Sequence, residues 1–173
     1  ALTARAPEAL GRHYEIAHPG RQWNTARNLR TLPLHDEWVA HGAHFGQVFG
    51  FERPFYFGKT SEPVLTFGRP DWFDHVGAEV IAAHEAVGLT ELSSFGKIDV
   101  TGPDALACLE AVCTNRIDRP VGSACYTLML NHKGGIESDL TVFRLGTDHF
   151  RLMVGTNAVK RDLFWIRNNC PPG

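Results

Sequence analysis

Apolar residues recur at regular intervals from residue 74 onward, and their spacing predicts helices and strands. Residues 74–87 are expected to form a helix with one largely apolar face made of Val76, Val80, His84 and Val87. Residues 97–101 alternate as a strand does. Pro103 and Asp104 then suit the first turn of a second helix. The apolar stripe of this second helix is formed by Leu106, Leu109, Val112 and Cys113.

Three strand-like runs follow, over residues 124–131, 136–145 and 149–155. The turns between them contain glycine, which favours hairpins because glycine adopts positive φ without strain. Asn157 is expected to cap a last helix. The apolar side of that helix is formed by Val159, Leu163 and Ile166. This order of elements predicts an α+β fold, an antiparallel meander with packed helices, rather than a parallel doubly wound sheet.

The first 70 residues are different in character, being rich in Arg, His, Pro, Gly and aromatic residues with little sustained periodicity. One short helix is expected over residues 34–41. We expect the rest, including residues 42–46 and 51–57, to be an irregular linker that lies across neighbouring domains. Glu52 and Arg53 are candidates for an internal ion pair that fastens it. The predicted division is therefore a linker over residues 1–70 and a domain over residues 71–173.

The composition is that of a globular protein and narrows the classes of function. Of 173 residues, 43% are hydrophobic and 21% charged, and the net charge is −2. Without a concentrated basic face, nucleic acid is not expected as a partner. The sequence contains no apolar run long enough to span a membrane, and its first residues do not resemble a secretion signal.

The spacing of cysteines and histidines argues against a metal centre. The four cysteines form no C-x-x-C pair, and the nine histidines show no H-E-x-x-H spacing. No bound metal is therefore expected. We expect the cysteines to be reduced, mostly buried thiols. They are Cys108, Cys113, Cys125 and Cys170.

Three stretches in a fixed order carry a resemblance to one family. They are ELSSFGKIDVTGPDA at 91–105, YTLMLNHKGGIESDLTV at 126–142, and PLH at 33–35 followed by GFERP at 50–54. The first two resemble the opening of the folate-binding aminomethyltransferase fold, the T-protein of the glycine cleavage system. The third resembles the junction between the flavin oxidoreductase part and the folate module of dimethylglycine and sarcosine dehydrogenases.

The resemblance implies a function in one-carbon transfer to tetrahydrofolate. In the fused dehydrogenases, FAD oxidises an N-methyl glycine to an iminium, and the folate module captures the carbon as methylene-tetrahydrofolate. Because the sequence has no G-x-G-x-x-G fingerprint, we expect FAD to bind in an upstream domain. The family's folate module also continues beyond the length of this chain. The chain is therefore expected to be the first lobe of that module, to pack on both neighbouring parts, and to bind folate weakly alone.

Asp139 is the first candidate for a catalytic residue. It resembles a family carboxylate that faces the reactive nitrogens of folate, where it can stabilise a cationic one-carbon unit and assist proton removal. Tyr126, Asn115 and Met129 resemble residues that line the same folate pocket. From pattern alone, each of the four has a structural alternative. These are a solvated strand residue for Asp139, a half-buried core residue for Tyr126, a helix C-cap for Asn115 and a core residue for Met129.

Two other functions remain open from the sequence. One is a stand-alone aminomethyltransferase or a demethylase of the same fold, against which the Glu52-Arg53-Pro54 junction counts because stand-alone members begin near the helix at Asp74. The other is a non-catalytic regulatory subunit like that of pyruvate dehydrogenase phosphatase, against which the presence of Asp139 and Tyr126 counts. The expected location is the bacterial cytoplasm or the mitochondrial matrix.

Overall fold

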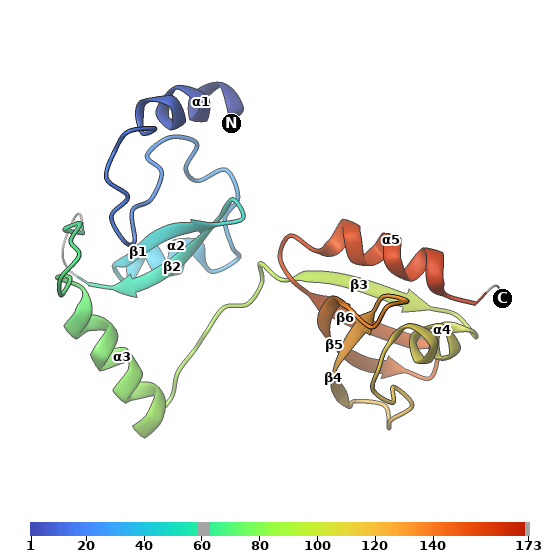
Figure 1. Cartoon of the computed structure of the whole chain (residues 1–173). Coiled ribbons are helices and arrows are strands. Elements are labelled where there is room, and N and C mark those ends of the chain that lie inside the picture. The colour runs from blue at the N-terminus through green and yellow to red at the C-terminus, as the bar shows by residue number, and fades with distance from the viewer. Residues whose placement is uncertain (59–62, 172–173) are drawn as a thin grey trace. The chain divides into compact units, whose positions relative to one another are not determined.

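The structure is a computed structural model that describes residues 1–58 and 63–171. The chain divides into two compact units, unit 1 over Ala1–Ser93 and unit 2 over Ser94–Gly173 (Figure 1). The sequence-based division into a linker over residues 1–70 and a folate-module domain over residues 71–173 stays a prediction.

Unit 1 contains a β-hairpin where the sequence was expected to run as irregular linker. Strands β1 and β2 pair antiparallel through a two-residue turn, Phe49-Gly50, in which both residues have positive φ. Pro54 is tolerated in β2 because it lies opposite Phe45, where the register shifts. The expectation of irregular chain at 42–46 and 51–57 is therefore wrong. The elements are α1 (Leu2–Gly11), α2 (His35–Ala40), β1 (Ala43–Val48), β2 (Phe51–Phe57) and α3 (Phe73–Glu85).

Two helices of unit 1 correspond to helices expected from the sequence, with one correction. Helix α2 confirms the helix expected at 34–41, and α3 confirms the helix expected at 74–87. The apolar face expected of α3 is not part of a core, since no residue of α3 is buried and Val80 is 51% exposed. Apolar spacing alone indicated a helix but could not show what packs against it.

Unit 2 has the order of elements expected from the sequence. Its four strands form one antiparallel sheet in the order β3-β6-β5-β4, in which β4, β5 and β6 are a meander (Figure 1). The glycine-containing turn between β4 and β5 uses Gly134 at φ 81°. The α+β prediction is confirmed. The elements are β3 (Gly96–Thr101), α4 (Ala105–Val112), β4 (Ala124–Leu130), β5 (Ile136–Gly146), β6 (His149–Val154) and α5 (Val159–Asn169).

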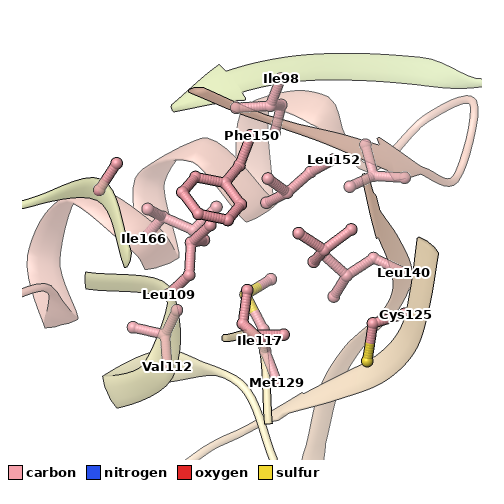
Figure 2. Packing of buried hydrophobic residues seen from close by; sticks show 13 residues of the cluster. Ile98, Leu109, Val112, Ile117, Cys125, Met129, Leu140, Phe150, Leu152 and Ile166 are labelled. Carbon is pink, nitrogen blue, oxygen red and sulfur yellow. The ribbon is translucent and has the colours of Figure 1, made fainter. Parts of the chain in front are cut away.

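The core of unit 2 lies between one face of the sheet, called here the inner face, and the two helices. Figure 2 shows Phe150 and Leu152 of the sheet with Leu109 of α4 and Ile166 of α5 in this core. Phe150, Leu152 and Leu109 are fully buried. Each such side chain contributes about 1.5–3 kcal/mol through burial. Both helices therefore pack on the inner face of the sheet.

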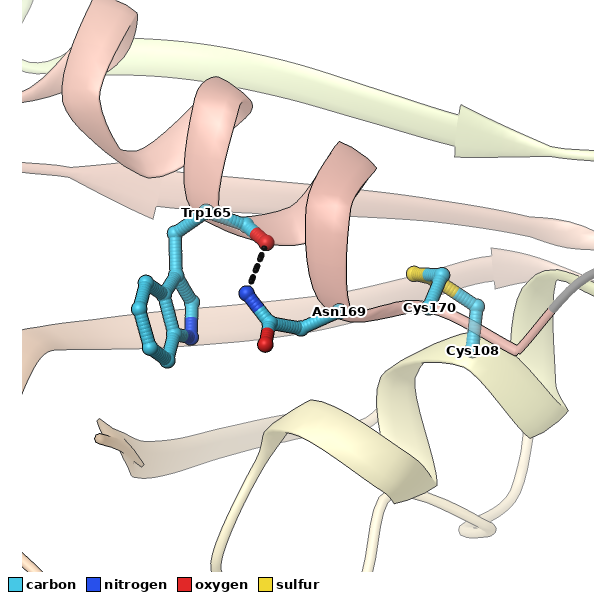
Figure 3. The surroundings of a disulfide bond; sticks show 4 residues. All are labelled: Cys108, Trp165, Asn169 and Cys170. Atoms are coloured by element: carbon cyan, nitrogen blue, oxygen red, sulfur yellow. Dashed lines mark hydrogen bonds between the residues drawn. A yellow bond between two sulfur atoms is a disulfide. The ribbon is translucent and has the colours of Figure 1, made fainter. Parts of the chain in front are cut away.

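A disulfide joins the middle of α4 to the end of α5. Cys108 of α4 is bonded to Cys170, the residue that follows α5 (Figure 3). The last turn of α5 is also held by Asn169, whose Nδ2 donates to the Trp165 carbonyl oxygen at 2.8 Å. The expectation that all four cysteines are thiols is therefore wrong for this pair. It holds for Cys113 and Cys125, which are free.

The cap of α5 also differs from the expectation. The N-cap residue is Ala158 rather than Asn157, and it makes no side-chain capping hydrogen bond. A buried carboxylate in the first turn, Asp162, lies near the positive end of the helix dipole instead.

Candidate functional site

Alternation along β4 and β5 places Tyr126 and Asp139 on the face of the sheet opposite the core, called here the outer face. On β4, Cys125 and Thr127 are buried while Tyr126 between them is 60% exposed. On β5, Leu140 is buried while Asp139 is exposed. Successive side chains of a strand point to opposite faces, so the two candidates share the outer face.

The register of the hairpin brings these two side chains into contact. Tyr126 pairs with Thr141, and Leu128 pairs with Asp139, so Tyr126 and Asp139 are diagonal neighbours on adjacent strands. The Tyr126 hydroxyl donates a hydrogen bond to Asp139 Oδ2 at 3.3 Å. Partial desolvation and the neighbouring Asp139 carboxylate raise the pKa of the Tyr126 phenol. The phenol therefore keeps its proton at neutral pH and serves as a donor to the carboxylate.

Apolar and charged residues surround this pair on the outer face. Thr141 pairs with Met153 of β6, so a row runs from Tyr126 across β5 to Met153, and both Thr141 and Met153 are half-buried. The neighbouring row contains Phe143, which pairs with Arg151. The pair is thus set in a surface on which rings and methyl groups adjoin the exposed carboxylate of Asp139.

An ion-paired group also lies on the same face. Arg151 binds Asp99 of β3 through two hydrogen bonds of 2.8 Å each, and His149 Nε2 lies 3.4 Å from the same carboxylate. Hydrogen bonds from Arg151 are the largest effect and outweigh desolvation, so the pKa of Asp99 is lowered to about 2. The charge of Arg151 is therefore neutralised by a partner within the sheet.

Asn115 lies at the edge of the sheet and holds β4 in place. Its side-chain Nδ2 donates to the Tyr126 carbonyl oxygen at 2.7 Å, and its backbone N–H donates to Thr127 Oγ1 at 3.0 Å. The C-cap of α4 is Cys113, so Asn115 does not have the capping role that the sequence left open. The structure brings Asn115 to the backbone of Tyr126 and leaves it exposed beside the candidate pair.

Met129 lies on the inner face of the sheet and is not grouped with the other three candidates. Its side chain is fully buried in the core of unit 2 (Figure 2). Because Met129 is three positions from Tyr126 on the same strand, the two side chains point to opposite faces. The structure thus gives Met129 the core position that the sequence left as its alternative, and we leave it out of the candidate site.

A buried polar pair on the inner face was not anticipated from the sequence. Ser138 Oγ donates to Asp162 Oδ2 at 2.8 Å, and both residues are buried. Arg161 Nε donates to the other oxygen of Asp162 at 3.0 Å. The sequence did indicate that Asp162 is buried, because it falls on the same helical face as Val159 and Ile166, where an apolar residue is normally expected.

A large cavity of about 980 Å³ lies in unit 1 and contains none of the candidate residues. Its lining includes a stack of aromatic rings formed by His44, Tyr56 and Trp72. Its arginines are already paired with glutamates of the same unit, namely Arg12 with Glu8, Arg21 with Glu15 and Arg27 with Glu52. Among the described residues that line the cavity, no arginine is thus left unneutralised for an anionic ligand.

Thiol and metal chemistry find no support in the described part of the chain. Burial raises the pKa of the Cys113 thiol to about 12, with Cys125 and Glu110 adding to the effect, so this thiol is protonated and unreactive at neutral pH. Within residues 1–58 and 63–171, no group of three or more metal-ligating side chains comes together. None of the helices in those ranges combines the length and apolar character needed to cross a membrane.

Two family models match this chain. The model described as the GCVT N-terminal domain matches residues 34–172, and the model described as the FAD dependent oxidoreductase central domain matches residues 1–31. The structure also resembles that of the glycine cleavage system aminomethyltransferase T from Bartonella henselae, with a TM-score of 0.61 and 24% identity. The likeness covers 81% of this chain and 35% of that one. It supports the fold.

Curated relatives match this chain at higher identity than that solved structure does. A 4-methylaminobutanoate oxidase (formaldehyde-forming) from Paenarthrobacter nicotinovorans is 45% identical over 86% of this chain and 18% of its own length. The mitochondrial regulatory subunit of mouse pyruvate dehydrogenase phosphatase is 36% identical over 98% of the chain and 20% of its own length. Human mitochondrial sarcosine dehydrogenase is 33% identical over 86% of this chain and 19% of its own length.

The chain therefore spans about a fifth of the length of these relatives. The family match covers most of the chain, extends over parts of both units, and agrees with the antiparallel α+β fold of unit 2. The chain belongs to the aminomethyltransferase family of the glycine cleavage T-protein, in the form that follows an FAD-dependent oxidoreductase segment as in sarcosine and dimethylglycine dehydrogenases.

Proposed function

We propose that the outer face of the sheet in unit 2 forms one wall of a tetrahydrofolate pocket. The enzyme to which it belongs would transfer a one-carbon unit from an N-methylated amino acid to the folate. The observation that carries the proposal is the contact between Tyr126 and Asp139 on an exposed sheet face of a domain of this family.

The residues of the outer face fit a reduced folate. Tetrahydrofolate presents a flat ring system with N–H groups, which suits a surface of rings and methyl groups that adjoins a hydrogen-bond acceptor. Phe143 and Met153 supply apolar contact area, and Asp139 supplies the acceptor. Tyr126, through its exposed ring, would pack against the ligand while its hydroxyl remains bonded to Asp139.

The chemistry of Asp139 in this role follows from its charge. The carbon to be transferred arrives on a nitrogen as a cationic group, and a carboxylate nearby stabilises that positive charge. The same carboxylate can accept a proton from a folate nitrogen as the new carbon–nitrogen bond forms. The donated hydrogen bond from Tyr126 holds one oxygen of Asp139, Oδ2, and leaves Oδ1 for the ligand. Asn115 would act indirectly, by holding the backbone of β4 at Tyr126.

Oxidation of the amine would be supplied by FAD bound elsewhere in the polypeptide. This sequence has no dinucleotide-binding fingerprint, so we assign no flavin contact to its residues. The named substrates of the relatives, sarcosine, dimethylglycine and 4-methylaminobutanoate, are all N-methylated amines that carry a carboxylate. We therefore assign the enzyme a substrate of this class, with methylene-tetrahydrofolate as the product of capture. The chain would pack on the flavin domain and on the remainder of the folate module.

A regulatory role is the second candidate function. It is favoured by the 36% identity to the pyruvate dehydrogenase phosphatase regulatory subunit, which extends over 98% of this chain. In that role the outer face would need no contact with folate. A titration with tetrahydrofolate therefore separates the two functions.

The test is to titrate the ¹⁵N-labelled chain with (6S)-tetrahydrofolate under anaerobic conditions and to follow amide chemical shifts. We expect weak, saturable changes concentrated at the outer face, around Tyr126, Asp139 and Phe143, with the core residue Met129 unaffected. Asp139→Asn should weaken folate binding at least tenfold, because it replaces the carboxylate by a neutral amide of the same shape. Unchanged spectra at millimolar folate would contradict the proposal and favour the regulatory role. Equal binding by Asp139→Asn would contradict the role proposed for Asp139.

A further inference from the structure

Asp162 is a carboxylate buried within unit 2 that the proposed chemistry does not use. It is 1% exposed and lies in the first turn of α5, on the inner face of the sheet. A buried carboxylate is costly unless its oxygens are hydrogen-bonded, and here both oxygens are, one by Ser138 and one by Arg161. An apolar residue would fill this position at a lower desolvation cost. The hydrogen bond between Asp162 and Ser138 therefore points to a specific role for Asp162.

Ser138 lies where β5 has the least support from its neighbours. The register of β5 with β6 begins only at Thr141, so residues 136–140 are paired with β4 alone. The pairing with β4 contains a bulge here, since Met129 pairs with Ser138 while Leu130 pairs with Ile136, which leaves Glu137 without a partner in the register. An irregular strand paired on one side is prone to slip in register.

A slip of one residue would remove the candidate site. Because side chains alternate between faces, it would turn Asp139 into the core and Ser138 onto the outer face. Asp139 would then lose its contact with Tyr126. The bond from Ser138 to Asp162 forms only in the observed register, in which Ser138 faces α5 and Asp139 faces outward.

We propose that Asp162 is a positioning residue for Asp139. Through its hydrogen bond with Ser138, it fixes the face and register of β5 so that the Asp139 carboxylate meets the Tyr126 hydroxyl. This inference rests on the proposed role of Asp139, and it identifies α5 as the element that holds the site from the opposite side of the sheet.

The test uses Ser138→Ala, which removes the hydroxyl, and Ser138→Thr, which keeps it on a residue suited to a strand. Asp162→Ala is the second variant. The first readout is the nuclear Overhauser contact between the Tyr126 ring and the Asp139 Hβ protons at neutral pH. The second is the alkaline titration of the Tyr126 phenol by absorbance, identified by its loss in Tyr126→Phe, with Asp139→Asn as the reference for a lost carboxylate.

We expect Ser138→Ala and Asp162→Ala to weaken the Tyr126–Asp139 contact and to make Tyr126 titrate at lower pH, toward the value in Asp139→Asn. Ser138→Thr should restore both readouts to those of the unchanged protein. A normal contact and a normal titration in Ser138→Ala, even with reduced stability, would overturn the positioning role and give the bond a purely structural one.

These outcomes are separable from those of the proposed function, because neither readout requires folate. Altered Tyr126 readouts in Ser138→Ala, without folate-induced shifts in the unchanged protein, would support positioning and overturn folate binding. Normal readouts in Ser138→Ala, with folate binding that Asp139→Asn weakens, would support folate binding and overturn positioning.

Discussion

Arg27, which is partly exposed, forms an ion pair with the buried carboxylate of Glu52, 25 residues along the chain, and this pair fastens the N-terminal segment to the β-hairpin of unit 1. The Glu52 side chain is fully buried and accepts hydrogen bonds from the Arg27 guanidinium, with 2.6 Å between Nη2 and Oε2. It also accepts bonds from the Asn28 backbone and the Gln47 side chain. The partner suggested by the sequence, Arg53, was therefore wrong, because neighbouring residues of a strand point to opposite faces.

Breaking this pair should destabilise unit 1 strongly. Arg27→Ala leaves the Glu52 carboxylate buried without its main partner, which costs about 3–5 kcal/mol. Hydrogen exchange of the β1 and β2 amides, read as a free energy of opening, measures this loss. The matched control is Arg69→Ala, which removes an exposed ion pair with Asp74 and should change stability by less than about 1 kcal/mol. Equal effects of the two variants would contradict the prediction.

The pair between Asp99 and Arg151 should give unit 2 an acid-dependent component of stability. Hydrogen bonds from Arg151 outweigh desolvation and hold the pKa of Asp99 at about 2, below its ordinary value of 3.8. A carboxyl whose pKa is lowered by folding stabilises the fold above its unfolded pKa, and that contribution is lost as pH falls through the folded value. The loss is therefore expected between about pH 4 and pH 2.

A carboxyl-detected NMR titration of Asp99 measures this directly. Arg151→Gln should move the midpoint upward toward 3.8, and unit 2 of that variant should lose less stability between pH 4 and pH 2. The control is Asp118, whose pKa is lowered by a hydrogen bond from Arg144 and not by Arg151. The Asp118 midpoint should not respond to the substitution, and an Asp99 midpoint that is also unmoved would show that the Arg151 contact is absent in solution.

The Cys108–Cys170 disulfide should contribute substantially to the stability of unit 2. It closes a loop of 62 residues, for which restriction of the unfolded chain amounts to about 4 kcal/mol. Cys170→Ser, or reduction of the unchanged protein, should lower the free energy of unfolding in urea by about this amount. Cys113→Ser is the control, because Cys113 is free and the variant should still respond to reductant. Four reactive thiols in the unfolded, unreduced protein would contradict the pairing.

The sequence predicted unit 2 more completely than unit 1, for physical reasons. Strand alternation and glycine turns are local signals, and they predicted the meander. Tyr126 and Asp139 were candidates through the family resemblance, and the register of the hairpin places them on one face. The same parity places Met129 on the opposite face, which favours its alternative as a core residue. The hairpin of unit 1 was missed because Pro54 and the aromatic residues obscure the alternation. The disulfide, the Arg27–Glu52 pair and the Ser138–Asp162 bond join residues distant in the chain, which no local pattern specifies.

Gly96 and Gly77 should respond in opposite ways to substitution by alanine. At Gly96 in β3, a methyl group would collide with Val154 and Val159, because α5 crosses close to the strand at this point. The resulting overpacking should cost unit 2 about 1–3 kcal/mol. At Gly77, inside α3, a methyl group meets nothing within 4 Å, and alanine should stabilise the helix by about 0.5–1 kcal/mol.

Hydrogen exchange distinguishes these effects because it reports on each unit separately. Gly96→Ala should accelerate exchange in β3, β5 and β6 without affecting unit 1, and Gly77→Ala should slow exchange within α3 alone. The close approach at Gly96 brings α5 against the sheet, and the same helix carries Asp162 to Ser138. Gly96→Ala should therefore also weaken the contact between Tyr126 and Asp139, and an unchanged contact would show that α5 can shift without disturbing the outer face.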